Sequence, residues 1–157
     1  MARTFCLPNF THELRSSAWL AGFIDGEGSF NISQSPRGNC WPVLSVTQRD
    51  DDRRLMEQIA DALGGSLQTV DHHGGGLPRN PIVHVKVINK AALLGVVAYF
   101  DAYPLRTKKA MEYVVWRGAV LAYVDEGGRS PILVEAKAFI ESSRVYKGTD
   151  VSLVKAP

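Results

Sequence analysis

The sequence predicts an α+β fold built around a single antiparallel sheet. Two kinds of pattern carry this prediction. In some stretches polar and apolar residues alternate, as in strands with one wet face, and in others apolar residues recur at helical spacing. Glycine, proline, asparagine and aspartate separate these stretches. The resulting order of elements is α-β-β-α-β-β-α-α-α.

The first half of the chain contains two helices and a hairpin. Residues 16–26 form the first predicted helix, and two serines at its start are available as caps. Two strands follow, at residues 29–37 and 41–48, joined through a turn at residues 36–39. Three consecutive aspartates from Asp50 suit a helix N-terminus, and this second helix ends where Gly64 and Gly65 interrupt the helical spacing.

The second half contains another strand pair and three helices. The strands cover residues 67–72 and 82–88, and a loop rich in glycine and proline joins them at residues 73–81. Asn89 caps a helix that runs to about residue 100. A long amphipathic helix follows at about residues 107–124, and Pro131 begins a last helix that reaches about residue 143.

Length and composition indicate one folded domain over residues 1–157, with a core at about 14–146 and a tail at 147–157. Hydrophobic residues make up 45% and charged residues 22% of the chain, which excludes a disordered protein. No apolar run approaches the roughly 20 residues that span a bilayer, and no signal peptide is recognisable, so we expect neither a membrane partner nor secretion. The expected location is the cytoplasm or nucleoid of a prokaryote, or the matrix or stroma of an organelle.

The balance of charge excludes a protein that is basic over its whole surface. The formal net charge is only +2, with acidic residues concentrated around 50–61 and basic residues around 106–109. A nucleic-acid-binding protein needs a basic face rather than a basic average, because phosphate contacts are local. DNA binding therefore remains open at this stage.

One face of the predicted sheet is rich in hydrogen-bonding side chains. Two interpretations fit: a solvated sheet face, which is ordinary in antiparallel sheets, or a surface that reads base edges in the major groove. The residues concerned are Asn31, Ser33, Ser35, Arg37, Ser45, Gln48, Gln68, His84 and Lys86, and the candidate DNA-binding set adds Ser29, Arg144 and Lys147.

The segment Leu20-Ala21-Gly22-Phe23-Ile24-Asp25-Gly26-Glu27-Gly28, followed by Ser29-Phe30, resembles the signature of the LAGLIDADG homing endonuclease family. Independently of this resemblance, three small residues lie four apart on one helix face, where they permit close contact with another helix. Together with the resemblance they predict a dimer interface formed by Ala18, Gly22, Phe23 and Gly26.

The resemblance implies the αββαββα-type fold of this family, with a saddle-shaped antiparallel sheet and helices on one face. Family members bring together two such helices, from two subunits or from two repeats. This chain holds one copy of the signature, so the expected partner is a second copy of the chain, which gives a homodimer with a twofold axis. The other expected partner is double-stranded DNA.

The resemblance also assigns the metal ligands. Glu27 is the expected catalytic carboxylate and binds metal together with the carbonyl of Gly26, while Asp25 is expected to support the end of the helix. Two carboxylates brought together by the twofold axis repel each other unless a cation lies between them, and oxygen ligands suit Mg²⁺, for which Mn²⁺ may substitute.

Two further segments resemble parts of the family's active site. Val46-Thr47-Gln48 implies that Gln48 positions water beside the scissile phosphate, whereas Asp52 stands where relatives have a base, so Arg49 or Arg53 is the candidate replacement. Pro104-Leu105-Arg106-Thr107-Lys108-Lys109 implies a basic side chain at the cleaved phosphate, with Arg106 and Lys108 as candidates. The expected phosphate neutralisers are Arg106, Lys108, Arg144 and Lys147.

The function that these expectations describe is a site-specific homing endonuclease associated with intron homing. It would hydrolyse two phosphodiesters across the minor groove of a long, roughly palindromic DNA target and leave 3′ overhangs. Two alternatives remain open within the same fold: a non-cutting DNA-binding regulator, and an RNA splicing maturase, whose partner is RNA.

Overall fold

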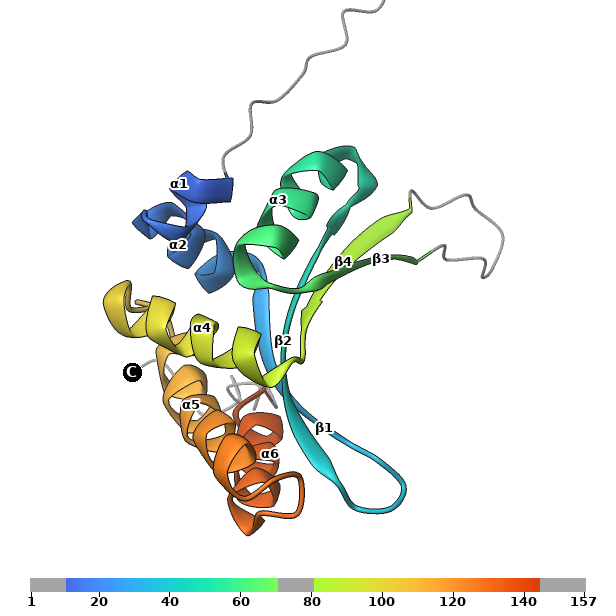
Figure 1. Ribbon diagram of the computed structural model, residues 1–157, viewed down its shortest axis with the longest axis vertical. Coiled ribbons are helices and arrows are strands. Elements are labelled where there is room, and N and C mark those ends of the chain that lie inside the picture. Colours follow the sequence, from blue (N-terminus) through green and yellow to red (C-terminus); the bar gives the residue numbers. More distant parts are fainter. Residues whose placement is uncertain (1–10, 71–80, 145–157) are drawn as a thin grey trace, which may run out of the picture.

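The computed structural model describes residues 11–70 and 81–144, and in this part of the chain helices line one side of a strongly curved sheet (Figure 1). The four strands are β1 (Gly28–Gln34), β2 (Cys40–Arg49), β3 (Ser66–Val70) and β4 (Ile82–Val87). The helices are α1 (Thr11–Arg15), α2 (Ala18–Glu27), the short 3-10 helix η1 (Asp50–Asp52), α3 (Arg53–Leu63), α4 (Lys90–Ala102), α5 (Lys109–Asp125) and α6 (Pro131–Arg144).

The strands are antiparallel and lie in the order β1-β2-β4-β3, so β1 and β3 are the edge strands of the described sheet. The register places Gly28 opposite Val46, and Val46 opposite Val85. This arrangement confirms the predicted α+β class with an antiparallel sheet.

The core lies between the sheet and the helices. Alternate strand residues such as Phe30, Leu44 and Val85 are fully buried, and they pack against the apolar sides of the helices. Trp116 of α5 is completely buried, and its ring centroid lies 5.1 Å from that of Phe30. Burial of one sheet face leaves the other face to the polar side chains, as the alternation in the sequence predicts.

The helix boundaries follow the predicted ones with small differences. Asn89 caps α4 as predicted, because its Oδ1 accepts hydrogen bonds from the backbone N–H groups of Ala91 and Ala92. The two serines before α2 do not act as side-chain caps: Ser17 is the N-cap residue but makes no cap hydrogen bond, and the hydroxyl of Ser16 donates to the carbonyls of α1. Helix α1 was not predicted, since five residues are too few to show a helical period.

The predicted strand at 29–37 is too long, because β1 ends at Gln34. The chain turns at Ser35, whose carbonyl accepts from Gly38 N–H and whose hydroxyl accepts from Asn39 N–H. Gly38 has a φ of 81°, which a residue with a side chain rarely adopts. Ser35 and Arg37 therefore belong to the hairpin turn rather than to the strand.

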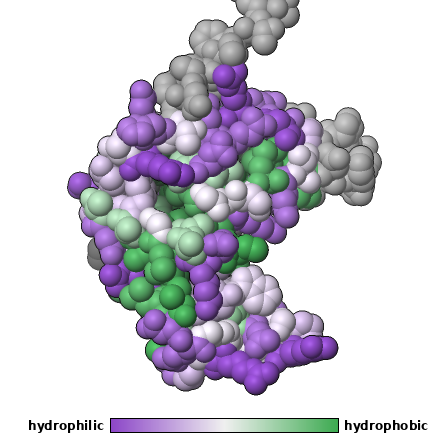
Figure 2. Space-filling view, in the orientation of Figure 1, coloured by the Kyte–Doolittle hydropathy of each residue, from purple (hydrophilic) through white to green (hydrophobic). Residues whose placement is uncertain are grey.

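Apolar side chains are exposed on the outer side of the helix layer (Figure 2). They include Leu94 of α4 and Met111, Val114 and Leu121 of α5. Within residues 11–70 and 81–144, none of the helices has the length and apolar character needed to cross a bilayer. The polar sheet face, rather than this apolar surface, has the chemistry that suits a nucleic acid.

Candidate active site and nucleic-acid interface

Helix α2 is held at its start by two tyrosines of the α4 region. The hydroxyl of Tyr99 donates to the carbonyl of Ser17 at 2.6 Å and accepts from the backbone N–H of Ala21 at 3.0 Å. The hydroxyl of Tyr103 donates to the carbonyl of Ser16 at 2.9 Å. These bonds satisfy backbone groups at the N-terminus of α2 and fix its position against the rest of the fold.

The small residues of α2 face outward. Ala18, Gly22 and Gly26 are exposed, and a Cβ atom added at Gly22 or at Gly26 would meet no atom within 4 Å. Packing within the chain therefore gives no reason for glycine at these positions. Phe23 stacks on Trp19 with ring centroids 5.2 Å apart, and Trp19 remains 49% exposed beside the glycines. The predicted dimer interface stays a prediction, and this surface is consistent with it.

Asp25 joins the end of α2 to the segment before α5. Its carboxylate accepts from the backbone N–H of Arg106 at 2.9 Å, from that of Thr107 at 3.0 Å and from the hydroxyl of Thr107 at 2.6 Å. Burial raises the pKa of Asp25, but these hydrogen bonds and the nearby charge of Lys109 outweigh it and leave the pKa below its usual value of 3.8. Asp25 is thus a structural residue that positions the basic segment.

We expect Asp25→Asn to lower the free energy of unfolding at neutral pH by about 1.5–3 kcal/mol, the usual contribution of hydrogen bonds to a charged group. Because the pKa of Asp25 is lower in the folded chain than in the unfolded one, its contribution is complete above about pH 4 and is lost as the pH falls through the folded value. Urea unfolding at pH 7 and at pH 3 measures this. An equal difference between wild type and variant at both pH values would contradict the assignment.

Lys109, which the sequence analysis did not select, lies at the centre of the candidate site. Its ammonium group donates to the carbonyl of Gly26 at 2.7 Å and to that of Ile24 at 3.4 Å. Burial lowers the pKa of Lys109, the charges of Asp25, Glu112 and Glu27 partly oppose this, and Arg144 adds to the lowering. The Pro-Leu-x-x-Lys-Lys segment contains two lysines, and only the tertiary fold shows which of them faces α2.

Glu27 and Gly26 lie together at the C-terminal end of α2, where the helix dipole favours a cation. Glu27 is exposed, and the Gly26 carbonyl already accepts a hydrogen bond from Lys109. Among the described residues, no group of three or more His, Cys, Asp or Glu is placed to hold a metal ion. One carboxylate and one carbonyl per chain fit Mg²⁺, which is usually bound by one or two protein carboxylates together with substrate phosphates.

Gln48 lies near this site but not on the polar sheet face. It pairs with Val83, whose side chain is in the core, while its neighbour Thr47 pairs with His84 on the polar face. The prediction that Gln48 belongs to the base-reading face is therefore wrong, because adjacent strand residues point to opposite faces. Gln48 is two residues beyond Val46, the partner of Gly28, and so lies at the same end of the hairpin as Glu27. Its role in positioning water stays a prediction.

The other candidate catalytic bases differ in their surroundings. Arg53 forms an ion pair with Asp50 and donates to the hydroxyl of Thr69 on β3, the edge strand opposite β1. Arg106 and Lys108 are exposed just before α5, and the backbone N–H of Arg106 donates to the carboxylate of Asp25. The catalytic roles of these three residues stay predictions, and the contacts of Arg53 direct it toward β3.

The polar sheet face consists of rows that cross the strands. One row, defined by the register, runs Ser29, Ser45, Lys86 and Ser66, and a second runs Thr47, His84 and Gln68. Thr47 Oγ1 lies 2.7 Å from Nδ1 of His84, and this threonine was not among the predicted residues of the polar face. Asn31 and Ser33 continue the face along β1, and Arg37 lies in the exposed hairpin turn. Lys147 lies outside the described residues.

Residues 20–120 match the family model described as LAGLIDADG endonuclease. The chain belongs to this family. The matched region extends from α2, which carries the signature, through most of α5, and so includes the whole described sheet and both Glu27 and Lys109. The predicted family is confirmed.

Similar proteins include several that are named after introns. The chain is 28% identical over 119 residues to probable intron-encoded endonuclease 4 of Neurospora crassa. This match covers 73% of this chain and 20% of that protein. It is 29% identical over 134 residues to probable intron-encoded endonuclease Cox1-I1b of Schizosaccharomyces pombe, a match that covers 82% of this chain and 32% of that protein. A shorter match, 36% identical over 55 residues, covers 35% of this chain and 8% of the intron-encoded RNA maturase bI4 of Saccharomyces cerevisiae. The chain thus spans a third or less of these relatives.

Solved structures of meganucleases share the fold. I-SmaMI bound to uncleavable DNA superposes with a TM-score of 0.65 at 24% identity, covering 84% of this chain and 45% of that chain. The homing endonuclease I-TnaI superposes with a TM-score of 0.62 at 19% identity, covering 83% and 88%. I-SmaMI has also been crystallised with its DNA target in the presence of calcium ions. These neighbours confirm the LAGLIDADG fold of the described residues.

Proposed function

We propose that this protein is a homing endonuclease that hydrolyses both strands of one long DNA site. The observation that carries the proposal is that the ammonium group of Lys109 binds the carbonyl of Gly26, the residue next to Glu27, at the end of an exposed helix. Hydrolysis of a phosphodiester needs a group that binds a divalent cation and a positive charge near the phosphate. The carboxylate of Glu27 and the ammonium group of Lys109 suit these two tasks. A protein that only binds DNA does not need this carboxylate beside the phosphate.

We propose the following roles for the residues of the site. The chain would hold Mg²⁺ or Mn²⁺ through Glu27 and the Gly26 carbonyl, together with DNA phosphate oxygens. The bound ion would supply activation of the attacking water and stabilisation of the leaving 3′ oxygen. Gln48 orients the water, and Lys109 stabilises negative charge on the phosphate. Arg106 and Lys108 contact phosphates beyond the cleaved bond, where they position the DNA.

The active unit that we propose is a homodimer in which two α2 helices pack through Ala18, Gly22, Phe23 and Gly26. Its twofold axis places two catalytic sites over one duplex and joins two four-stranded sheets into an eight-stranded saddle. The target is then roughly palindromic, and cuts across the minor groove leave 3′ overhangs. The chain aligns with 45% of I-SmaMI but with 88% of I-TnaI, so one such unit has about the extent of the I-TnaI chain.

The test is cleavage of duplexes that the protein selects from a randomised DNA library, with Mg²⁺ and with chelator. Double-strand cuts with Mg²⁺ and intact, bound DNA with chelator are the expected results. The match to the maturase bI4 supports RNA splicing as a second candidate function, which predicts intron RNA binding and no DNA cleavage. We propose the mitochondrial matrix as the location, because the relatives include intron-encoded proteins and one protein named as mitochondrial.

Lys109→Met should reduce the single-turnover cleavage rate by about 10²–10³-fold, because it removes a charge aimed at the reacting phosphate. The adjacent change Lys108→Met removes the same charge from an exposed site. It should leave the rate within a few-fold of wild type and reduce the dependence of affinity on salt concentration. If the two variants exchange these effects, Lys108 is the catalytic lysine and Lys109 has a structural role.

A further inference from the structure

A buried acidic residue outside the candidate catalytic group is connected to the polar sheet face. Glu112 of α5 is 6% exposed, and its carboxylate binds the guanidinium of Arg144, at the end of α6, at 3.1 Å. The hydroxyl of Ser143 donates to the same carboxylate at 3.3 Å. Burying a carboxylate is costly unless it is paired, so this contact fixes the position of Arg144.

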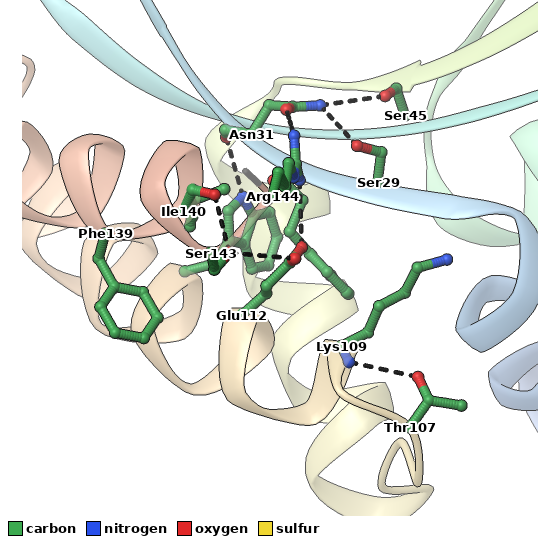
Figure 3. Close-up of polar contacts among 12 residues, drawn as sticks. Ser29, Asn31, Ser45, Thr107, Lys109, Glu112, Phe139, Ile140, Ser143 and Arg144 are labelled. Carbon is green, nitrogen blue, oxygen red and sulfur yellow. Dashed lines mark hydrogen bonds and ion pairs between the residues drawn. The ribbon is translucent and has the colours of Figure 1, made fainter. Parts of the chain in front are cut away.

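Arg144 in turn contacts the edge strand β1 (Figure 3). Its guanidinium donates to Oδ1 of Asn31 at 2.6 Å and to the carbonyl of Phe30. Asn31 projects from the face opposite the buried side chain of Phe30, so Arg144 reaches a side chain of the polar face from the helix layer. The guanidinium is thus hydrogen-bonded to three protein groups, the carboxylate of Glu112, the amide oxygen of Asn31 and the carbonyl of Phe30. Its link to the polar face is the side chain of Asn31.

The orientation of the Asn31 amide is forced by this contact. A guanidinium can only donate hydrogen bonds, so the amide atom that faces Arg144 must be the oxygen. Nδ2 therefore points to the serines, and it donates to Ser29 Oγ at 3.1 Å and to Ser45 Oγ at 3.4 Å. Ser29 and Ser45 are directly opposite each other on neighbouring strands.

A hydroxyl that accepts a hydrogen bond keeps its own O–H for donation. No residue in the described parts of the chain accepts a hydrogen bond from Ser29 or Ser45. Both hydroxyls are half-buried on the polar face, and Ser29 is two residues from Glu27. We propose that Glu112, Arg144 and Asn31 are positioning residues that orient Ser29 and Ser45 as hydrogen-bond donors, so that this pair selects an acceptor atom of the bound DNA near the cleavage site.

This inference rests on the proposed function and assigns the polarity of one contact. The acceptor is either a purine N7 in the major groove or a phosphate oxygen, since both accept from a hydroxyl. The probe is a duplex that the wild-type protein selects from a randomised DNA library. Copies of it carry 7-deazapurine at one position at a time, or a methylphosphonate at one phosphate at a time, and affinity is measured at fixed salt concentration.

Wild type should lose about 5- to 100-fold in affinity at one or two substituted positions. Asn31→Ala removes the residue that orients the pair, and the penalty at those positions should disappear while penalties elsewhere remain. Glu112→Gln should reduce the same penalty, and if this buried variant does not fold, Asn31→Ala still decides. Glu141→Gln, on the exposed side of α6, is the matched control and should keep the wild-type pattern.

Asn31→Asp reverses the polarity, because the carboxylate oxygen that replaces Nδ2 would accept from both serines and leave the serine oxygens facing the DNA. This variant should also lose the penalty, and it should select a duplex with a different base at those positions. An identical pattern of penalties in wild type, Asn31→Ala and Asn31→Asp would overturn the inference while leaving the proposed function intact. If wild type selects no duplex at all, the proposed function and this inference are both wrong.

Discussion

Glu27→Gln should reduce DNA cleavage by about 1000-fold or more and leave DNA binding intact. In our proposal this carboxylate is the charged metal ligand that each chain offers at the end of α2. Metal catalysis contributes several kcal/mol, and each 1.4 kcal/mol equals a tenfold change in rate. The amide keeps the shape of the side chain and removes its charge. In a homodimer both subunits carry the substitution, so neither DNA strand should be nicked. Single-turnover cleavage and gel retardation on the same duplex provide the two measurements.

The matched control is Glu57→Gln, which makes the same chemical change at an exposed position of α3. This variant should cleave at the wild-type rate. Binding by the Glu27 variant should be equal to wild type or tighter, because repulsion between the carboxylates and the DNA phosphates is removed. Cleavage at the wild-type rate by Glu27→Gln would show that another group holds the metal.

Gly22→Leu should convert the proposed dimer into folded monomers and abolish cleavage. A leucine cannot fit where two helix backbones meet, whereas within one chain a side chain at Gly22 meets no atom within 4 Å. Leucine is also the better helix former by about 0.5–1 kcal/mol, so the isolated chain should be no less stable. Sedimentation velocity reports the mass, and circular dichroism during urea titration reports the folding.

Gly95→Leu serves as the control, because Gly95 is an exposed glycine within helix α4 and its added Cβ would also meet nothing. This variant should keep the wild-type mass and activity. A dimeric, active Gly22→Leu protein would place the interface elsewhere. An unfolded one would mean that Gly22 is needed inside the chain, which its open surroundings argue against.

The family and the order of elements followed directly from the residues. A nine-residue signature is specific by itself, and strands and helices reveal themselves because their side-chain periods of two and 3.6 are visible in one dimension. Capping of α4 by Asn89 was predictable for the same reason, since cap and helix are adjacent. The short α1 had no such signal, and the length of β1 was overestimated because the alternation continued into the turn at Ser35.

The residues of the site were only partly predictable. The sequence indicated Glu27 and a basic segment in which Arg106 and Lys108 were the chosen candidates. That Lys109 is the lysine facing α2 depends on how α5 begins against α2, which the sequence does not show. It also placed Gln48 on the polar face, where the register shows Thr47 instead. A shift of one residue along a strand exchanges the faces, and the residue count alone does not fix where a strand starts.

By itself, then, the sequence determined the family, the fold class and the helix that carries the signature, because these depend on local patterns. Only the tertiary structure decided which groups meet at sequence separations of 82 or more: Asp25 with Thr107, Lys109 with Gly26, and Arg144 with Asn31. Such contacts depend on the packing of α5 and α6 against the sheet, which no short segment encodes. Burial of Glu112 and the openness of Gly22 are properties of the same kind, since they depend on what surrounds a residue in space.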